Sequence, residues 1–286
     1  MLDDPQAGAR ALIEVSGPDA QRFLQGLISA DLNALPPGGA RPAALLTVKG
    51  KIVSEAVALR RRDGRLLLAV PRDVATAVHE ELERHVIMDD VTLSATNEVL
   101  ALVWPEWAGD APGVEAFTTA HPAPGTLLLG ESTAIEPSLT GLRRADAKEF
   151  ERHRITSGVP GWRREITEGT FPPEVGFVAA VSYDKGCFRG QEPLARIHAR
   201  GQVNWVMARV RAASAPAAIT GLMSEERADA GRWTSWTDAD GGDHVVGLAI
   251  VHRSVASPGR ALRAGEIAVE VTSGPLGDDL GVKGRR

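Results

Sequence analysis

The chain has 286 residues, of which 43% are hydrophobic and 24% are charged, a composition that indicates a folded, soluble protein of two or three domains. Its 32 basic and 37 acidic residues give a net charge of −5, which leaves no overall positive field to attract a nucleic-acid backbone or an anionic membrane. The single cysteine, Cys187, excludes an intramolecular disulfide and a zinc site built from several thiolates of this chain.

The N-terminal residues and the apolar runs indicate where the protein is located. The first residues lack the basic and apolar regions of a signal peptide, and no apolar run approaches the length that spans a bilayer. We therefore expect a cytoplasmic protein with no membrane or nucleic-acid partner.

The first hundred residues alternate between strand and helix patterns. Ser16-Gly17-Pro18-Asp19 separates an apolar strand from a stretch with helical apolar spacing, which predicts a helix start. A second helix has apolar residues four apart, from Val74 to Val86. The predicted strands of this region are 11–15, 43–48, 52–59, 66–70, 91–93 and 99–103.

The rest of the chain changes character twice. Residues 109–125 are rich in Pro, Gly and Ala and predict a loop or domain junction, and a helix follows over 142–154. Residues 161–176 predict a long irregular segment of the kind that is often functional. Beyond Gly201, short strand patterns separated by polar turns predict an all-β module. The seven histidines show no metal-site spacing, and we expect them to be solvated.

Chemistry is concentrated in residues 183–201. Cys187 lies two residues after Lys185, one of only five lysines, and between two glycines. A nearby ammonium or guanidinium group favours the reactive thiolate, so Lys185 and Arg189 are expected to lower the pKa of the thiol. The alternative is that Cys187 is a small buried hydrophobic residue, as lone cysteines often are.

This segment resembles the signature of the YgfZ family, a branch of the superfamily that contains the glycine-cleavage T-protein. The matching residues are Lys185, Gly186, Cys187, Phe188, Gly190, Gln191, Glu192, Arg196, Arg200 and Gly201. The resemblance extends over most of the chain, through Ser16-Gly17-x-Asp19, Phe23-Leu24-Gln25-Gly26, Asp31, Lys49-Gly50-Lys51-Ile52, Pro173-Glu174-x-Gly176-Phe177, Gly247 and Ser257-Pro258.

The resemblance implies an α+β fold in which three modules form a ring around a central folate channel. Two of them are α/β modules, residues 1–40 with 100–200 and residues 41–99, and the third is an all-β barrel over 201–286. It also implies tetrahydrofolate or a one-carbon derivative as the cofactor, and iron-sulfur proteins or assembly factors as partners.

The implied site residues fall into two groups. Cys187, Lys185, Gln191 and Glu192 are the expected catalytic residues. The expected folate-binding residues are Glu174, Arg196, Arg200, Trp162 and Glu55, in which the carboxylate of Glu174 grips the pterin edge, an arginine binds the glutamyl tail, and Trp162 with Phe171 stacks on the rings. No metal ligand is expected.

Two positions depart from the family pattern. The aspartate that the aminomethyltransferase members need for transfer to folate is replaced by Ser54 or displaced to Glu55, and a second acidic folate contact is replaced by Thr156. Glycine-cleavage activity is therefore not expected.

Three functions follow as hypotheses. The leading one is a folate-binding accessory protein for iron-sulfur cluster assembly or repair that uses Cys187. The alternative is a folate-dependent one-carbon transferase or demethylase in which Glu55 moves a proton. The third is a folate-carrying interaction module without chemistry.

Overall fold

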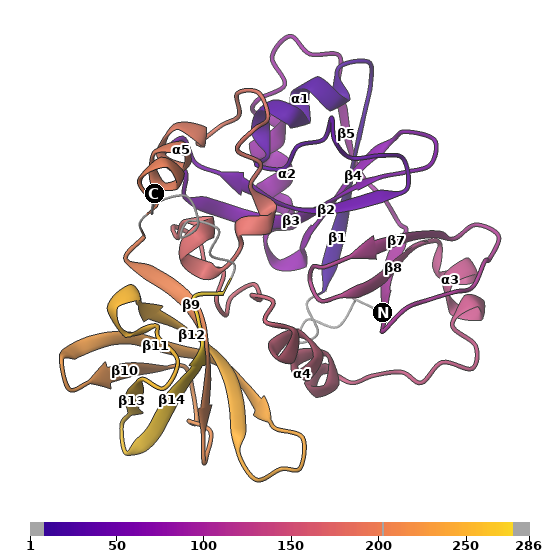
Figure 1. The fold of residues 1–286 in the computed structure, drawn as a ribbon. Helices are drawn as coiled ribbons and strands as arrows, with labels where there is room; N and C mark the ends of the chain where they lie inside the picture. The colour runs from indigo at the N-terminus through magenta and orange to yellow at the C-terminus, as the bar shows by residue number, and fades with distance from the viewer. Residues whose placement is uncertain (1–8, 202, 277–286) are drawn as a thin grey trace. The chain divides into compact units, whose positions relative to one another are not determined.

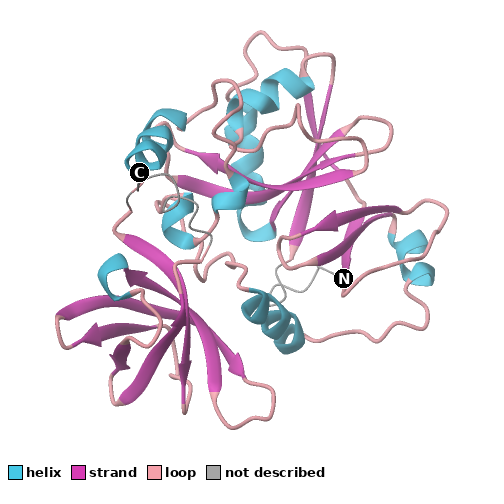
Figure 2. Cartoon of the chain, in the orientation of Figure 1, coloured by secondary structure: helices cyan, strands magenta, loops and turns pink. Residues whose placement is uncertain are grey.

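A computed structural model describes residues 9–201 and 203–276. The chain divides into two compact units. Unit 1 comprises the residues up to Ala147 together with Ala180–Gln191, and unit 2 comprises Lys148–Ala179 together with the chain from Glu192 onward. Figure 1 labels the elements of both units, and Figure 2 shows their secondary structure.

Unit 1 is built on a five-stranded antiparallel sheet whose strand order is β2-β3-β4-β1-β5. The strands are β1 (Arg10–Ser16), β2 (Gly39–Leu46), β3 (Ile52–Arg60), β4 (Leu66–Pro71) and β5 (Thr92–Ala95). Helices α1 (Ala20–Leu27) and α2 (Ala75–Glu83) contribute their apolar residues to one core with this sheet. The strand and helix patterns of the first hundred residues are therefore confirmed, with ends that differ by a few residues.

A smaller sheet in unit 1 has the order β6-β8-β7. Its strands are β6 (Val99–Val103), β7 (Glu115–Thr119) and β8 (Gly125–Gly130), and the short helix α3 (Ser132–Ser138) follows. The loop expected over 109–125 is wrong in its second half, because β7 lies there. Five strand residues between turns give too weak an alternation to be seen in a Pro- and Gly-rich stretch.

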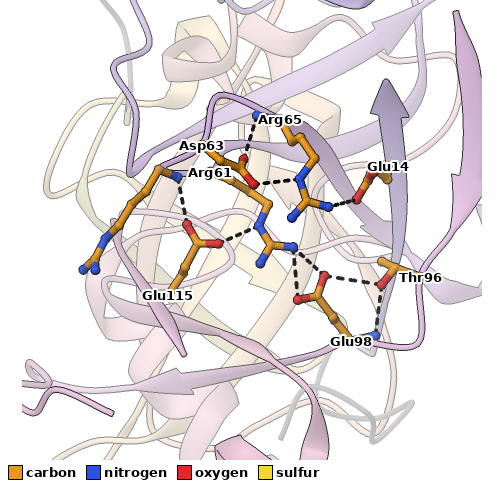
Figure 3. A network of polar contacts seen from close by, with 8 residues as sticks. Glu14, Arg61, Asp63, Arg65, Thr96, Glu98 and Glu115 are labelled. Atoms are coloured by element: carbon orange, nitrogen blue, oxygen red, sulfur yellow. Dashed lines mark hydrogen bonds and ion pairs between the residues drawn. The ribbon is translucent and has the colours of Figure 1, made fainter. Parts of the chain in front are cut away.

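A network of ion pairs joins the β3–β4 turn to the smaller sheet (Figure 3). The guanidinium group of Arg61 contacts Glu115 on β7 at 2.5 Å and Glu98, just before β6, at 2.8 Å. Arg65 pairs with Asp63 at 2.8 Å and with Glu14 on β1 at 3.1 Å. The two sheets of unit 1 are thus tied by charge as well as by chain connection.

Unit 2 contains a closed six-stranded barrel with the order β10-β11-β12-β9-β14-β13. The strands are β9 (Trp205–Ala212), β10 (Thr220–Ser224), β11 (Arg227–Asp238), β12 (Val245–His252), β13 (Ala261–Ala264) and β14 (Ile267–Ser273). Inward-facing small and branched residues pack around the fully buried Trp233. The α+β fold class with a C-terminal all-β barrel is confirmed.

Helix α4 (Ala147–Ser157) and the segment after it pack on the outside of this barrel. Arg154, which is 1% exposed, donates to Glu165 at 2.9 Å, to Glu151 at 2.7 and 2.8 Å and to Ser235 of β11 at 2.8 Å. Glu165 has no exposed surface and also accepts from the hydroxyls of Thr234 and Ser235. A buried ion pair therefore fastens residues 148–166 to the barrel.

The observed boundaries differ from those expected in the sequence. The sheet of unit 1 contains β1 as well as β2–β5, so the expected division at residue 40 falls inside one sheet. Residues 148–179 belong with the barrel rather than with the N-terminal module. Strand pairing and buried ion pairs between distant residues decide both points, and neither leaves a local pattern in the sequence.

Candidate functional site

The loop that contains Cys187 is held to the C-terminal end of α1 by Lys185. The ammonium group of Lys185 donates three hydrogen bonds, to the carbonyl oxygens of Gln25 at 2.7 Å, Ile28 at 2.8 Å and Ala30 at 2.7 Å. It also lies 4.9 Å from the ring centroid of Phe188. All three N–H bonds of the ammonium are therefore used, and a cation sits where the carbonyl groups at the end of a helix favour one.

Lys185 is 7% exposed, and this burial has an electrostatic consequence. Burial lowers the pKa of Lys185 to about 8, against the opposing effect of the carboxylate of Asp31. A neutral amine has two N–H bonds, so deprotonation leaves one of the three carbonyl groups without its donor. The buried charge therefore costs stability below about pH 8, and this cost falls as the pH rises from about 8 towards the ordinary value of 10.5.

Three further contacts fix the loop on both sides of Cys187. The segment before it runs beside residues 29–31, because the amide of Ser182 donates to the carbonyl of Ser29 at 3.0 Å. After it, the amide of Arg189 donates to the carbonyl of Gly26 at 2.8 Å, and its guanidinium group pairs with Glu81 of α2. Phe188 is 6% exposed. The loop is therefore anchored by main-chain bonds, an apolar ring and two cations.

Gly190 brings this loop against the Lys49-Gly50-Lys51 turn. Its φ is +79°, and a Cβ atom there would lie 2.5 Å from the carbonyl oxygen of Thr47 and 3.0 Å from the Cα of Gly50. Only glycine fits both the backbone angle and the space. Three of the five lysines, Lys49, Lys51 and Lys185, thus belong to this part of unit 1.

Cys187 itself is exposed, and so is Gly186. The alternative of a buried hydrophobic cysteine is therefore wrong. The interpretation of Lys185 and Arg189 changes as well, because their charged groups bond to main-chain carbonyls and to Glu81. Their contacts give them the role of anchors that present the thiol on a fixed turn, from which it can reach a partner or a ligand.

Gln191 and Glu192 begin helix α5 (Gln191–Arg200). The side-chain oxygen of Gln191 accepts from the amide of Phe188 at 3.3 Å, so Gln191 supports the Cys187 loop from the following helix. Glu192 is exposed and pairs with Arg196 one turn later at 2.6 Å. Of the four expected catalytic residues, three therefore lie in or contact the loop, and Glu192 lies on the helix surface.

Each expected folate-binding residue of unit 2 has its own local environment. Glu174 accepts from the amide of Phe171 at 3.0 Å and so closes the 3-10 helix over Pro172–Val175. Trp162 is half-buried with the guanidinium of Arg163 5.1 Å from its ring centroid. Arg196 and Arg200 are exposed. Thr156 is exposed and donates to the carbonyl of Arg152 at 2.8 Å.

These placements are compatible with a folate ligand in three respects. Each oxygen of a carboxylate accepts two hydrogen bonds, so Glu174 keeps acceptor capacity for the amide-like edge of a pterin while it caps its own turn. The exposed guanidinium of Arg200 remains available for an anionic tail. The half-buried ring of Trp162 offers a surface for stacking.

Glu55 lies in a different environment from the one a proton-transfer role needs. Its carboxylate has no exposed surface and is shared between Arg10, at 2.6 Å, and His121. Burial raises the pKa of Glu55, but the charges of Arg10 and His121 outweigh burial and lower it to about 2. Ser54 is equally buried and donates to the carbonyl of Glu55. The expectation of solvated histidines is wrong for His121, which is 2% exposed.

Sequence reasoning missed Arg10 and His121 as partners of Glu55, and Ser29 as a support of the loop. Ser29 has no exposed surface, accepts from the amide of Ala44 at 2.8 Å and donates to the carbonyl of Ala180 at 2.5 Å. A polar residue inside the apolar run Leu27–Ala30 is the one local signal that it needs a buried partner.

Within the described residues, no three His, Cys, Asp or Glu side chains converge as a metal site. None of the helices in that part of the chain has the length and apolar character of a membrane span.

Comparison with known proteins gives consistent relatives. Residues 9–104 match the family model described as the GCVT N-terminal domain. The tRNA-modifying protein YgfZ of Edwardsiella ictaluri is 30% identical over 215 residues, which cover 66% of this chain and 65% of that protein. The human mitochondrial iron-sulfur cluster assembly factor IBA57 is 30% identical over 240 residues, which cover 70% of this chain and 66% of that protein.

The fold has a solved counterpart. The glycine cleavage system aminomethyltransferase T of Bartonella henselae superposes with a TM-score of 0.75 over 95% of this chain and 85% of that one, at 19% identity. This likeness shows the fold. The chain spans slightly less than two thirds of the length of the two curated relatives. Together with the Lys185–Gly201 signature, the sequence matches show that the chain belongs to the YgfZ family of the glycine-cleavage T-protein superfamily.

Proposed function

We propose that this protein is a tetrahydrofolate-binding accessory factor for the assembly or repair of iron-sulfur clusters, with Cys187 as its reactive thiol. The observation that carries the proposal is the exposed Cys187 on a turn that Lys185, Phe188 and Arg189 fix in place. A cluster usually takes four thiolates, so Cys187 shares one with the thiolates of a partner or of glutathione. Two relatives carry the names of a tRNA-modifying protein and a cluster assembly factor, which support this direction. The net charge of −5 favours the cluster role over direct RNA binding.

Substitution of Cys187 by alanine is expected to abolish the ability of this protein to restore iron-sulfur enzyme activity in a strain that lacks it. The side chain is exposed, so the fold is unaffected. The measurement is the activity of an iron-sulfur enzyme in extracts of the complemented strain, at matched levels of the wild-type and variant proteins. Undiminished rescue by Cys187→Ala would refute the thiol role.

Two glycine variants separate the thiol from its presentation. Gly190→Ala keeps Cys187 but forces the loop away from Thr47, and it is expected to lower rescue. Gly186→Ala is the matched control, because no atom lies within 4 Å of the added Cβ. Equal rescue by both variants would show that the thiol acts without a fixed loop.

Folate binding rests on Glu174 and the arginines of α5. Tetrahydrofolate, when bound, supplies a carrier for a one-carbon unit. We expect folinic acid to change the tryptophan fluorescence of the full-length protein in a saturable manner, with a roughly tenfold or greater loss of affinity in Glu174→Ala, because charge-assisted hydrogen bonds contribute about 1.5–3 kcal/mol. Glu168→Ala, an exposed carboxylate of the same segment, is the control. No saturable response in the wild type would remove folate from the proposal.

A folate-dependent one-carbon transferase is the second candidate, and the aminomethyltransferase fold favours it. The environment of Glu55 counts against it. A general base must come within hydrogen-bond reach of the substrate amine. Both oxygens of Glu55 already hold Arg10 and His121, and no part of the side chain is exposed.

A further inference from the structure

Two adjacent apolar side chains of unit 1 are exposed, and they belong to the connection between α2 and β5. Figure 1 labels these two elements. Ile87 is 83% exposed and Met88 is 93% exposed, the highest values among the large hydrophobic residues that the structure describes. Single exposed apolar residues are common on protein surfaces. Two consecutive residues that are almost fully exposed form a larger apolar area in contact with water, and such an area is typical of an interaction site. We call Ile87 and Met88 the apolar tip.

The connection that carries the apolar tip is held at both ends. On one side, the amides of His85 and Val86 bond to the last turn of α2. On the other, the amide of Asp90 donates to the Asp19 carboxylate at 2.9 Å, and the amide of Asp19 donates back to the carbonyl of Asp90 at 3.3 Å. The tip is therefore presented by a fixed turn, which lowers the entropy cost of binding.

Glycine at position 17 makes this attachment possible. Its φ is +109°, and a Cβ atom there would lie 2.2 Å from the carbonyl oxygen of Asp90. The strand-to-helix turn at Gly17 and the connection behind the tip are thus in direct contact. A side chain at position 17 would push the two apart.

The charges beside the tip limit what can cover it. Asp89 and Asp90 follow it, Asp19 bonds to Asp90, and Arg22 pairs with Asp19 at 3.2 Å and with Asp89 at 2.7 Å. On the other side, Arg84 pairs with Glu81 of α2. The hydrogen bond from the amide of Asp90, together with Arg22, lowers the pKa of Asp19, so this carboxylate is ionised at neutral pH. Three carboxylates against the one guanidinium of Arg22 leave the aspartate side of the tip with an excess of negative charge.

From this geometry we infer that the apolar tip is a docking site for another protein, one that offers an apolar pocket rimmed by lysine or arginine. A second copy of this chain would bring two acidic aspartate sides together, and an anionic membrane would repel the same carboxylates. A basic-rimmed protein pocket satisfies both the apolar and the acidic parts of the surface. Helix α1, about 12 Å long, separates the Asp19 end from the end that anchors Lys185, so a partner on the tip also comes near the Cys187 loop.

The test begins with photo-crosslinking in cells from a benzoylphenylalanine placed at position 87, followed by titration of the crosslinked protein in purified form. Burial of two large apolar side chains predicts at least a roughly tenfold loss of affinity in Ile87→Ser/Met88→Ser. Met223→Ser, an exposed methionine of the barrel, is the control and should bind as the wild type does. Asp90→Asn should slow association and weaken its dependence on salt.

The crosslinking and the titration together decide the inference. A protein partner whose affinity falls with the tip variant and not with Met223→Ser supports the inference. Crosslinking only to a second copy or to lipid, no crosslinked product, or equal affinity for wild type and tip variant would each overturn it. The titration uses protein without folate or an iron-sulfur cluster, so a failure of the proposed thiol chemistry leaves this result readable on its own.

Discussion

Replacement of Arg154 by methionine is expected to lower the free energy of unfolding by about 3–5 kcal/mol, the usual cost of removing one partner from a buried ion pair. Glu165 has no exposed surface and would keep its charge with only the amide of Gly161 and the hydroxyls of Thr234 and Ser235 as partners. Urea denaturation followed by circular dichroism measures the change. The loss belongs to unit 2, because every partner of Arg154 lies in that unit.

Helix α4 supplies a matched control for this prediction. Arg152 is two residues away, but its side chain is 41% exposed and pairs with the fully exposed Asp240. Arg152→Met should therefore change stability by less than about 1 kcal/mol. The double variant Arg154→Met/Glu165→Gln should be more stable than Arg154→Met, because it removes the uncompensated charge. Equal losses of unfolding free energy in Arg152→Met and Arg154→Met would show that the buried ion pair stabilises the protein no more than the exposed one.

The second large effect is a loss of folding stability at acid pH, which comes from the protonation of Glu55. Its pKa is about 2 in the folded protein, below the ordinary value of 4.5. A carboxyl group with a lowered folded pKa stabilises the protein above its unfolded pKa, and this stability is lost as the pH falls through the folded pKa. The difference corresponds to about 3 kcal/mol, lost between about pH 4.5 and pH 2.

A comparison of variants isolates this contribution from other carboxyl groups. Glu55→Gln should be less stable than the wild type at pH 7, and the difference between the two should shrink as the pH falls from about 4.5 to 2. Glu83→Gln, whose side chain is 58% exposed, should follow the wild type at every pH. A constant difference between Glu55→Gln and the wild type across this range would mean that the ion cluster with Arg10 and His121 does not set the pKa of Glu55.

Local patterns in the sequence predicted many of the elements because each depends on neighbours along the chain. Apolar residues four apart gave α2, and polar turns between short apolar runs gave the barrel module. The turn at Gly17 was predicted from the same residues that form it. The small sheet β6-β8-β7 was predicted only at β6, since β7 is a five-residue strand inside a Pro- and Gly-rich stretch.

The candidate site was located by sequence, but the partners of its side chains were not. Lys185 was correctly placed in the same loop as Cys187, yet its three acceptors lie at least 155 residues earlier in the chain. The same holds for His121, which looks like any surface histidine until β3 and the turn after β7 are brought together around Glu55. Long polar side chains choose among many possible partners, and folding makes that choice.

The sequence by itself therefore determined the family, the position of the candidate loop and the α+β class, because motif spacing and hydrophobic periodicity are properties of short stretches. The tertiary structure decided that Cys187 is exposed, that Lys185 is an anchor and that Glu55 is buried. It also assigned residues 148–179 to the barrel through Arg154 and Glu165. Burial and charge pairing are set by residues far apart in the chain, and no local pattern specifies them.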